Sequence, residues 1–420
     1  MKTTLVLLII LGLLLALYLW RAPRPDFFAL YQQDDAASRS LKEFYRRPLK
    51  SLEVEGVRWS YYSGGSGEKT ILLCHGMGGA YELWWQQIMA WEQDFRLISY
   101  TLPDEIDQLD AVVKGLSAIL EEEKVDKFIV IGTSMGGYIA QYLVKNMPQR
   151  VEKAVFGNTF PPNGVLAREN KGRAALLPWL PEIVISKFGA RQFKQTILPA
   201  AHHDSLLAAF LPALPFSKKA FIGRYHIVVE PFGTNPCAYP IRRIPKLIVE
   251  SDNDPLVPPA LREELKKLYP DAAVFTFKGE GHFPYINAAQ QYNEAVKAFL
   301  LQKDELPGVE KVVQQYIQGR KTADIELLSA AFHPEARLMT SGEEGVMLIS
   351  LADYLAKVGQ DGPQQIHTQM ISIDLTHPAA TAKVQFDYGT HAYMDYLSLL
   401  YSQGQWRIMN KTFVKQEAAP

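Results

Sequence analysis

The chain has 420 residues, 48% of them hydrophobic and 21% charged, which is enough for roughly two to three globular domains. Its 44 basic and 45 acidic residues give a net charge of −1, so there is no electrostatic case for nucleic-acid binding. Two cysteines exclude a disulfide framework. Neither belongs to a C-x-x-C pair, so the sequence indicates no metal and no cofactor.

The first segment is apolar: Leu5 to Trp20 carries no charged residue and is rich in leucine and isoleucine. It is slightly shorter than the roughly 20 residues that cross a bilayer, and Thr3, Thr4 and aromatic residues near its end can make up the length. We predict a single-pass transmembrane anchor over residues 1–24, with a cleaved signal peptide as the alternative. Basic residues are denser after the span, which favours a cytoplasmic catalytic domain, but short anchors also export the domains attached to them, so the side of the membrane stays open.

A polar juxtamembrane segment at residues 25–50 includes a helical stretch near Ala36–Arg47. Two strands are expected around Leu52–Tyr62, broken by a turn at Gly64–Gly67. A regular alternation then predicts a mainly parallel sheet flanked by helices. Its expected elements are strand 70–74, helix 81–91, strand 95–100, helix 105–122, strand 127–131, helix 137–147 and strand 151–157.

The strand at 70–74 opens into the loop His75-Gly76-Met77-Gly78-Gly79. An H-G loop after the third strand supplies one backbone donor of an oxyanion hole, here the N–H of Met77. His75 is expected to be structural rather than catalytic.

The motif Gly-Thr-Ser-Met-Gly-Gly at residues 132–137 lies between an apolar strand and a helical pattern. Strand, G-x-S-x-G and helix in this order predict a nucleophile elbow with Ser134 as the nucleophile. Gly132 and Gly136 let strand and helix approach closely. The N–H of Met135, the residue after the nucleophile, is the second predicted oxyanion donor.

A helical insertion rich in Leu, Ala, Phe and Pro is expected at about residues 161–240, as a cap over the site. Apolar helices there imply an apolar acyl or alkyl pocket. The simpler interpretation is that most of these side chains pack the cap onto the core. The pair His202-His203 has no matching carboxylates and is expected at the surface rather than on a metal.

Two further candidates come after the cap, each behind a strand. The strand 246–250 runs into Asp252 and Asp254, and the strand 273–277 is followed by His282. Serine, acid and histidine in this order predict a triad in which His282 is the general base and Asp254 orients it. In the alternative interpretation the aspartates only cap a helix and His282 is an ordinary loop residue.

Residues of about 50–303 resemble the α/β-hydrolase fold, and residues 132–141 followed by Gly157–Phe160 are most similar to its maspardin-like branch. Consistent with that branch, Ser99–Pro103 lacks the usual glycine-rich loop after the fourth strand. The resemblance places the acid at Asp254, before the x-x-Pro that opens the next helix, with Asp252 shaping the loop. Some maspardin-like proteins are regarded as binding proteins.

Two functions therefore stay open. The first is a membrane-anchored serine hydrolase that cleaves a small apolar carboxylic ester through an acyl-enzyme. The second is a non-catalytic binding or scaffold protein. Cleavage of C–C or thioester bonds by the same triad is a further possibility, whereas dehalogenase and epoxide-hydrolase chemistry would need an aspartate at Ser134.

A polar stretch ending in Pro307-Gly308 marks a boundary. Helices at 308–318 and 322–331 and a mainly β stretch then predict an α+β cone. Its motifs, at 312–319, 331–334 and 406–413, resemble the NTF2-like superfamily and within it the lumazine-binding group.

Cones of this kind serve isomerases, ligand-binding modules and dimerisation domains. His333, Asp374 and Asp395 could be fitted to an isomerase site, but a structural or interface role is preferred, including a homodimer through this domain. The predicted organisation is an anchor (1–24), a juxtamembrane segment (25–50), an α/β-hydrolase sheet with helical cap (51–303) and an α+β NTF2-like domain (308–416).

Overall fold

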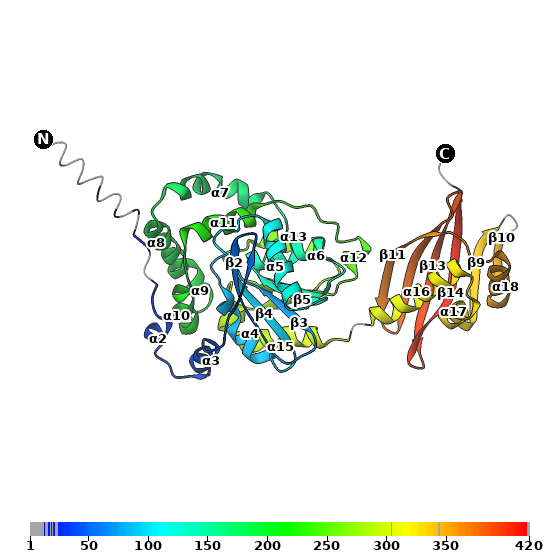
Figure 1. Cartoon of the computed structure of the whole chain (residues 1–420), viewed down its shortest axis with the longest axis horizontal. Coiled ribbons are helices and arrows are strands. Elements are labelled where there is room, and N and C mark those ends of the chain that lie inside the picture. The colour runs from blue at the N-terminus through cyan, green and yellow to red at the C-terminus, as the bar shows by residue number, and fades with distance from the viewer. Residues whose placement is uncertain are drawn as a thin grey trace, which may run out of the picture. The chain divides into compact units, whose positions relative to one another are not determined.

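The computed structural model describes residues 12, 16, 18, 20, 21, 24–303, 305–342 and 345–417 (Figure 1). It divides into two compact units. The first comprises the described residues up to Asn235 together with Ile244–Leu301, and the second comprises Pro236–Arg243 and the described residues from Gln302 onwards.

The predicted membrane anchor falls almost entirely outside the described residues. Within the described ranges, no single helix is long and apolar enough to cross a membrane. Helices α10 (Ser205–Ala213) and α11 (Lys218–Val229) meet the length and composition of a span only as a pair, and they are bent by 106° relative to each other.

The first unit is built on an eight-stranded sheet in the order β1-β2-β4-β3-β5-β6-β7-β8. Strand β2 runs antiparallel to β1 and β4, and the other neighbours are parallel. The strands are β1 (Lys50–Val54), β2 (Val57–Gly64), β3 (Thr70–Cys74), β4 (Arg96–Thr101), β5 (Phe128–Thr133), β6 (Val151–Gly157), β7 (Lys246–Ser251) and β8 (Ala273–Phe277). Every residue of β3, β5 and β7 is buried, as expected for continuous apolar runs at the centre of a parallel sheet.

Helices alternate with these strands. They are α3 (Ala36–Phe44), η1 (Tyr81–Trp84), α4 (Trp85–Trp91), α5 (Leu109–Glu122), α6 (Met135–Asn146), α13 (Pro259–Leu268), α14 (Pro284–Asn287) and α15 (Ala289–Leu301). Large aromatic side chains from α4, α14 and α15 fill much of the core, among them Trp85, Tyr285 and Tyr292. This packing fixes the sheet whose carboxyl ends carry the site.

Three local expectations differ from the structure. The turn between the first two strands is at Glu55-Gly56, where both residues have positive φ (52° and 77°), and Gly64–Gly67 instead leads from β2 towards β3. The expected helix 81–91 is a 3-10 turn followed by α4. The helix expected from 105 begins at Leu109, because Asp104–Gln108 forms turns after Pro103.

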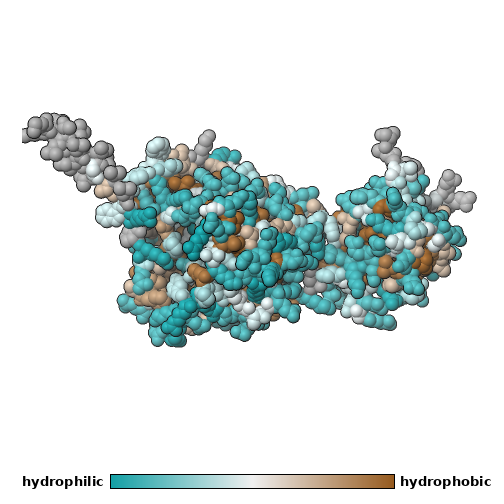
Figure 2. Space-filling model, viewed as in Figure 1, coloured by the Kyte–Doolittle hydropathy of each residue, from teal (hydrophilic) through white to brown (hydrophobic). Residues whose placement is uncertain are grey.

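The cap consists of α7 (Val165–Leu176), η2 (Leu177–Trp179), α8 (Glu182–Gln192), η3 (Phe193–Ile197), α9 (Leu198–Ala200), α10 and α11. Its apolar side chains divide into two groups. Leu207 and Phe210 of α10 are buried in the main core, and the Phe210 ring centre lies 4.3 Å from that of Trp85. Leu176, Trp179 and Phe188 of the cap are exposed to solvent. The face of the molecule that Figure 2 shows is otherwise mostly hydrophilic.

The second unit packs helices against a six-stranded sheet in the order β10-β9-β14-β13-β12-β11. Only the β14–β9 pair is parallel. Its elements are α16 (Leu306–Thr322), α17 (Ile325–Ala331), β9 (Phe332–Gly342), β10 (Gly345–Ser350), α18 (Leu351–Asp361), β11 (His367–Thr376), β12 (Ala379–Asp387), β13 (His391–Ser402) and β14 (Gln405–Glu417).

Two features of this unit are additions to the expected cone. Helix α18 begins at Leu351, and the hydroxyl of the preceding Ser350 accepts a hydrogen bond from the N–H of Asp353 as an N-cap. Helix α12 (Tyr239–Arg242) precedes β7 in the chain but packs here. The Tyr239 hydroxyl donates to Glu310 at 2.6 Å, and Arg243 pairs with the same carboxylate at 2.9 Å.

Candidate active site

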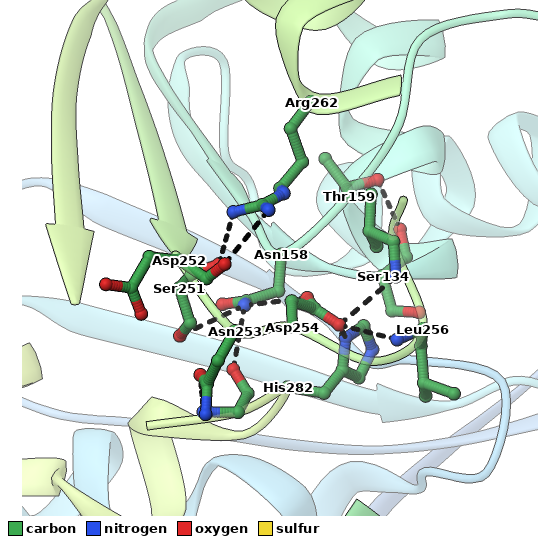
Figure 3. Close-up of polar contacts among 12 residues, drawn as sticks. Ser134, Asn158, Thr159, Ser251, Asp252, Asn253, Asp254, Leu256, Arg262 and His282 are labelled. Atoms are coloured by element: carbon green, nitrogen blue, oxygen red, sulfur yellow. Dashed lines mark hydrogen bonds and ion pairs between the residues drawn. The ribbon is translucent and has the colours of Figure 1, made fainter. Parts of the chain in front are cut away.

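Ser134 occupies a sharp turn between β5, which ends at Thr133, and α6, which begins at Met135. Its backbone φ is +54° and its ψ −121°, a conformation that costs a non-glycine residue energy and is held only by its surroundings. The Ser134 N–H donates to the Gly157 carbonyl at 2.9 Å, and the Thr159 hydroxyl donates to the Ser134 carbonyl at 2.6 Å (Figure 3). The end of β6 therefore fixes the turn from both sides.

The elbow glycines leave no room for a side chain. A Cβ on Gly132 would lie 2.0 Å from the Gly136 carbonyl oxygen, and one on Gly136 would lie 2.0 Å from the Cys74 carbonyl oxygen. Because these obstacles are backbone atoms of β3 and α6, any larger residue would push the strand and helix apart.

Asp254 and His282 contact each other directly. The His282 Nδ1 lies 2.9 and 2.8 Å from the two Asp254 carboxylate oxygens, and both side chains are buried. The N–H groups of Leu256 and Val257 donate to Asp254 Oδ1 at 2.8 and 3.1 Å. Burial acts to raise the pKa of the Asp254 carboxyl, but the charge and hydrogen bond of His282 and the other donors outweigh it, and the pKa lies below its usual value.

Asp252 has a different role from Asp254. Its Oδ1 accepts the N–H of Gly279 at 2.9 Å, and its Oδ2 lies 3.5 Å from the Lys278 ammonium. These contacts hold the loop that follows β8, and they leave Asp254 as the carboxylate on His282 (Figure 3).

The site also contains a residue that sequence reasoning missed. Asn158, at the end of β6, is buried with φ +40°, and its Nδ2 donates to Asp254 Oδ2 at 2.9 Å and to the Gly281 carbonyl at 3.3 Å. It therefore links the acid to the loop that carries His282. The sequence did offer one sign of this role: Asn158 directly follows β6, and β6 lies beside β7, the strand that precedes Asp254.

His75 is a structural histidine. The Leu102 N–H donates to its Nε2 at 3.0 Å, so the proton resides on Nδ1, which donates to the Gly76 carbonyl at 2.7 Å. Burial, reinforced by the positive charge of Arg224, lowers the pKa of His75 to about 3, so the ring is neutral. Through these two hydrogen bonds the neutral ring holds the loop, which passes close to the nucleophile: a Cβ on Gly76 would lie 3.4 Å from the Ser134 Cβ.

The same loop is tied to the cap by Arg224 of α11, a second residue that the sequence did not reveal. Its guanidinium donates to the carbonyls of Met77 at 2.8 Å, Gly79 at 2.9 Å and Leu102 at 3.1 Å. The side chain is buried, and burial lowers its pKa.

Two backbone amides, those of Met77 and Met135, are the predicted donors to a negative oxygen at Ser134. Met135 is the first residue of α6, a position whose N–H has no partner within the helix. Met77 lies in the loop beside Ser134, and its carbonyl accepts a hydrogen bond from Arg224 that orients the loop. Together they could stabilise an oxyanion on a carbonyl attacked by Ser134.

The remaining cysteines and histidines singled out by the sequence form no hydrogen bond with the side chains of Ser134, Asp254 or His282 among the residues that the structure describes. Cys74 is buried, Cys237 is exposed, and both are free thiols. His202 and His203 have positive φ in the turn before α10. Within the described residues, no group of three or more His, Cys, Asp or Glu side chains is placed to hold a metal ion.

The chain belongs to the α/β-hydrolase fold family, whose model ("alpha/beta hydrolase fold") matches residues 69–289. A second family model, described as "Putative lumazine-binding", matches residues 304–414. The fold of both units thus confirms the sequence-based prediction of an α/β-hydrolase domain followed by an NTF2-like α+β domain.

Among individual proteins, the chain is similar to maspardin of Mus musculus and of Homo sapiens. Each is 26% identical over 271 residues, covering 61% of this chain and 84% of the relative. The maspardin-like resemblance is confirmed. A hydrolase from Pseudomonas aeruginosa PA01 has a TM-score of 0.52 at 20% identity, covering 60% of this chain and 98% of its own. The enol-lactonase from Burkholderia xenovorans LB400 has the same score at 16% identity, covering 60% and 100%.

Proposed function

We propose that this protein is a serine hydrolase that cleaves carboxylic esters of apolar character. The observation that carries the proposal is the Asp254–His282 pair, which shares one end of the sheet with Ser134 on its strained elbow. A merely structural histidine would not need a buried carboxylate on Nδ1 that is itself held by three donors.

In this mechanism His282 accepts the Ser134 proton at Nε2, while its Nδ1–H stays hydrogen-bonded to the Asp254 carboxylate. The Ser134 oxygen attacks the ester carbonyl, and the Met77 and Met135 amides hold the resulting oxyanion. The imidazolium then protonates the departing alcohol and leaves an acyl-enzyme. Water, deprotonated by His282, releases the acid by the reverse sequence. Asp254 stays ionised throughout and stabilises the imidazolium.

The apolar character of the substrate is inferred from the cap. Its helices α7 and α10 are rich in Leu and Ala, α8 and α11 add Ile, Val and Phe, and Arg224 of α11 reaches the loop beside Ser134. Cap residues therefore lie next to the reacting centre, where apolar side chains would bind acyl or alkyl groups.

Membrane attachment through residues 1–24 is part of the proposal and rests on their apolar sequence. Carbonate-resistant membrane association that disappears when residues 1–24 are deleted is the expected result. A mature N-terminus after residue 20 would show a cleaved signal instead.

Homodimerisation through the second unit is likewise proposed. Tyr396, Leu400 and Val414 on neighbouring strands β13 and β14 are each more than two-fifths exposed, and such apolar side chains can pair two sheets. Leu400→Lys should convert a dimer to a monomer in light scattering. A mass that stays unchanged would contradict this interface.

The alternative function is that of a binding or scaffold protein without turnover, and the similarity to maspardin favours it. Labelling with a fluorophosphonate probe distinguishes the two. The proposed hydrolase should be labelled in the wild type and not in Ser134→Ala, while an unlabelled, folded wild type would support the scaffold.

A further inference from the structure

The most exposed large apolar side chains of the first unit are on the cap and at the end of the N-terminal segment. Among the described residues of this unit, the four highest exposed fractions belong to Trp179 (79%), Phe188 (65%), Trp20 (62%) and Leu176 (61%). Leu176, Trp179 and Phe188 belong to α7, η2 and α8, which lie at the outer edge of the unit (Figure 1), and we call these three side chains the cap patch. Large apolar side chains that gather on a surface mark a contact with a partner or a membrane.

Lys218, the first residue of α11, joins the segments that carry the cap patch. Its ammonium donates to the Pro178 carbonyl in η2 at 2.8 Å, and its backbone N–H donates to the Glu182 carboxylate at the start of α8 at 3.1 Å. Leu176 and Trp179 are within two residues of Pro178, and Phe188 is about 9 Å further along α8 than Glu182. The three apolar side chains therefore surround one junction of the cap.

The same lysine holds the end of the apolar N-terminal segment at this junction. The Tyr18 hydroxyl donates to the Pro178 carbonyl at 3.3 Å and accepts from the Lys218 ammonium at 3.2 Å. That ammonium lies 4.7 Å from the centre of the Tyr18 ring. The described residues of the segment Leu5–Trp20 are all exposed. A bilayer that takes up this segment would therefore lie beside the cap patch.

The charge around the cap patch is positive. Residues 161–220 contain eight Lys and Arg residues but three Asp and Glu residues, whereas the whole chain balances 44 basic against 45 acidic residues. Lys187, Arg191 and Lys194 flank Phe188 in sequence, and all three are exposed without an ion pair to another residue that the structure describes. Exposed tryptophan and phenylalanine next to unpaired basic side chains fit the headgroup region of an anionic bilayer.

We propose that the cap lies on an anionic phospholipid bilayer. Leu176, Trp179 and Phe188 enter the boundary between headgroups and acyl chains, and the neighbouring lysine and arginine side chains contact the lipid phosphates. This inference builds on the membrane attachment proposed above and goes beyond it, because it states which face of the catalytic unit contacts the lipid. It does not rest on ester cleavage.

The test is quenching of a fluorescent label on the full chain by nitroxide lipids, in vesicles containing roughly one-third phosphatidylglycerol. Cys237→Ser removes the exposed thiol and leaves the buried Cys74, so that the label attaches to Ala175→Cys in α7 or, as the matched control, to Lys267→Cys in α13. Both of these positions are exposed. A nitroxide near the headgroups should quench the α7 label by about two-fold or more, because the cap patch would enter about 5–10 Å into the interface. The α13 label should stay unquenched.

Two variants separate the cap patch from the anchor. Trp179→Ser removes its most exposed ring, and Val274→Ser removes an exposed apolar side chain of β8 as the control. Both variants should float with the vesicles, but only Trp179→Ser should lose quenching of the α7 label. Replacing phosphatidylglycerol by phosphatidylcholine should also reduce the quenching, because the basic side chains lose their anionic partners.

Flotation and quenching distinguish two kinds of failure. A chain that does not float with the vesicles would contradict the membrane attachment and this inference together. In a chain that floats, an unquenched α7 label, equal quenching in Trp179→Ser, or equal quenching in phosphatidylcholine vesicles would overturn the inference alone. So would an α7 label shielded from both lipid nitroxide and aqueous iodide, because the cap patch would then be covered by a second copy or by the N-terminal segment.

Discussion

The Asn158 side-chain amide donates to Asp254 Oδ2 at 2.9 Å, across the ends of the neighbouring strands β6 and β7. The same carboxylate oxygen lies 2.8 Å from His282 Nδ1. The orientation of the acid thus depends on a residue that would not itself touch substrate, which makes Asn158 a positioning residue for the proposed triad.

Asn158→Ala should therefore lower kcat for an ester by about 10- to 100-fold with little change in KM, since a hydrogen bond to a charged group contributes about 1.5–3 kcal/mol. Steady-state kinetics on p-nitrophenyl butyrate measure it. Asn146→Ala, which removes a similar amide at the far end of α6, is the matched control. Equal kinetics in both variants would show that Asn158 does not position the acid.

Arg224 gives a second prediction. Arg224→Met removes three hydrogen bonds to the carbonyls of Met77, Gly79 and Leu102 and frees the loop that carries one oxyanion donor. We expect kcat/KM to fall by about 10²-fold, the order seen when one oxyanion donor is lost. Arg191→Met, on the exposed surface of α8, should leave kcat/KM within two-fold of wild type (roughly 0.4 kcal/mol). If Arg224→Met, still folded, behaves like this control, the cap does not hold the loop.

The buried His75 predicts a pH dependence of stability. Its pKa is about 3 when folded, against an ordinary value of 6.5, so below pH 6.5 the unfolded chain takes up a proton that the folded chain refuses. Its contribution to stability is therefore present above about pH 6.5 and declines as the pH falls towards 3.

Urea unfolding followed by tryptophan fluorescence measures the free energy of unfolding of the first unit. Between pH 7 and pH 5 this free energy should decrease more in the wild type than in His75→Asn. The exposed His226 supplies the control, because His226→Asn should keep the wild-type slope. A wild-type-to-His75→Asn difference that is constant with pH would contradict a buried neutral ring.

The sequence predicted well the features that are local. The strand–turn–helix around Ser134 and the strand ends before Asp254 and His282 are visible in short windows, because apolar runs and glycines specify them. Asn158 and Arg224 escaped notice because their roles arise from contacts 96 and 147 residues apart in the chain.

The second unit shows the same limit. Asp395 has the same strand parity as Leu397 and Leu399, which are buried, so the alternation of β13 could have assigned it to the inner face. Its partners Tyr316 and Lys411 come from α16 and β14, and no sequence pattern joins them. The transmembrane prediction still rests on the apolar sequence of residues 1–24.

The most direct test of the proposed hydrolase is ester turnover by Ser134→Ala. On p-nitrophenyl butyrate the variant should lose on the order of 10⁴-fold or more in kcat, because the nucleophile that forms the acyl-enzyme is gone. Ser117→Ala, in the helix α5, should keep wild-type turnover. Wild-type activity retained in Ser134→Ala would contradict the central claim that this serine carries the reaction.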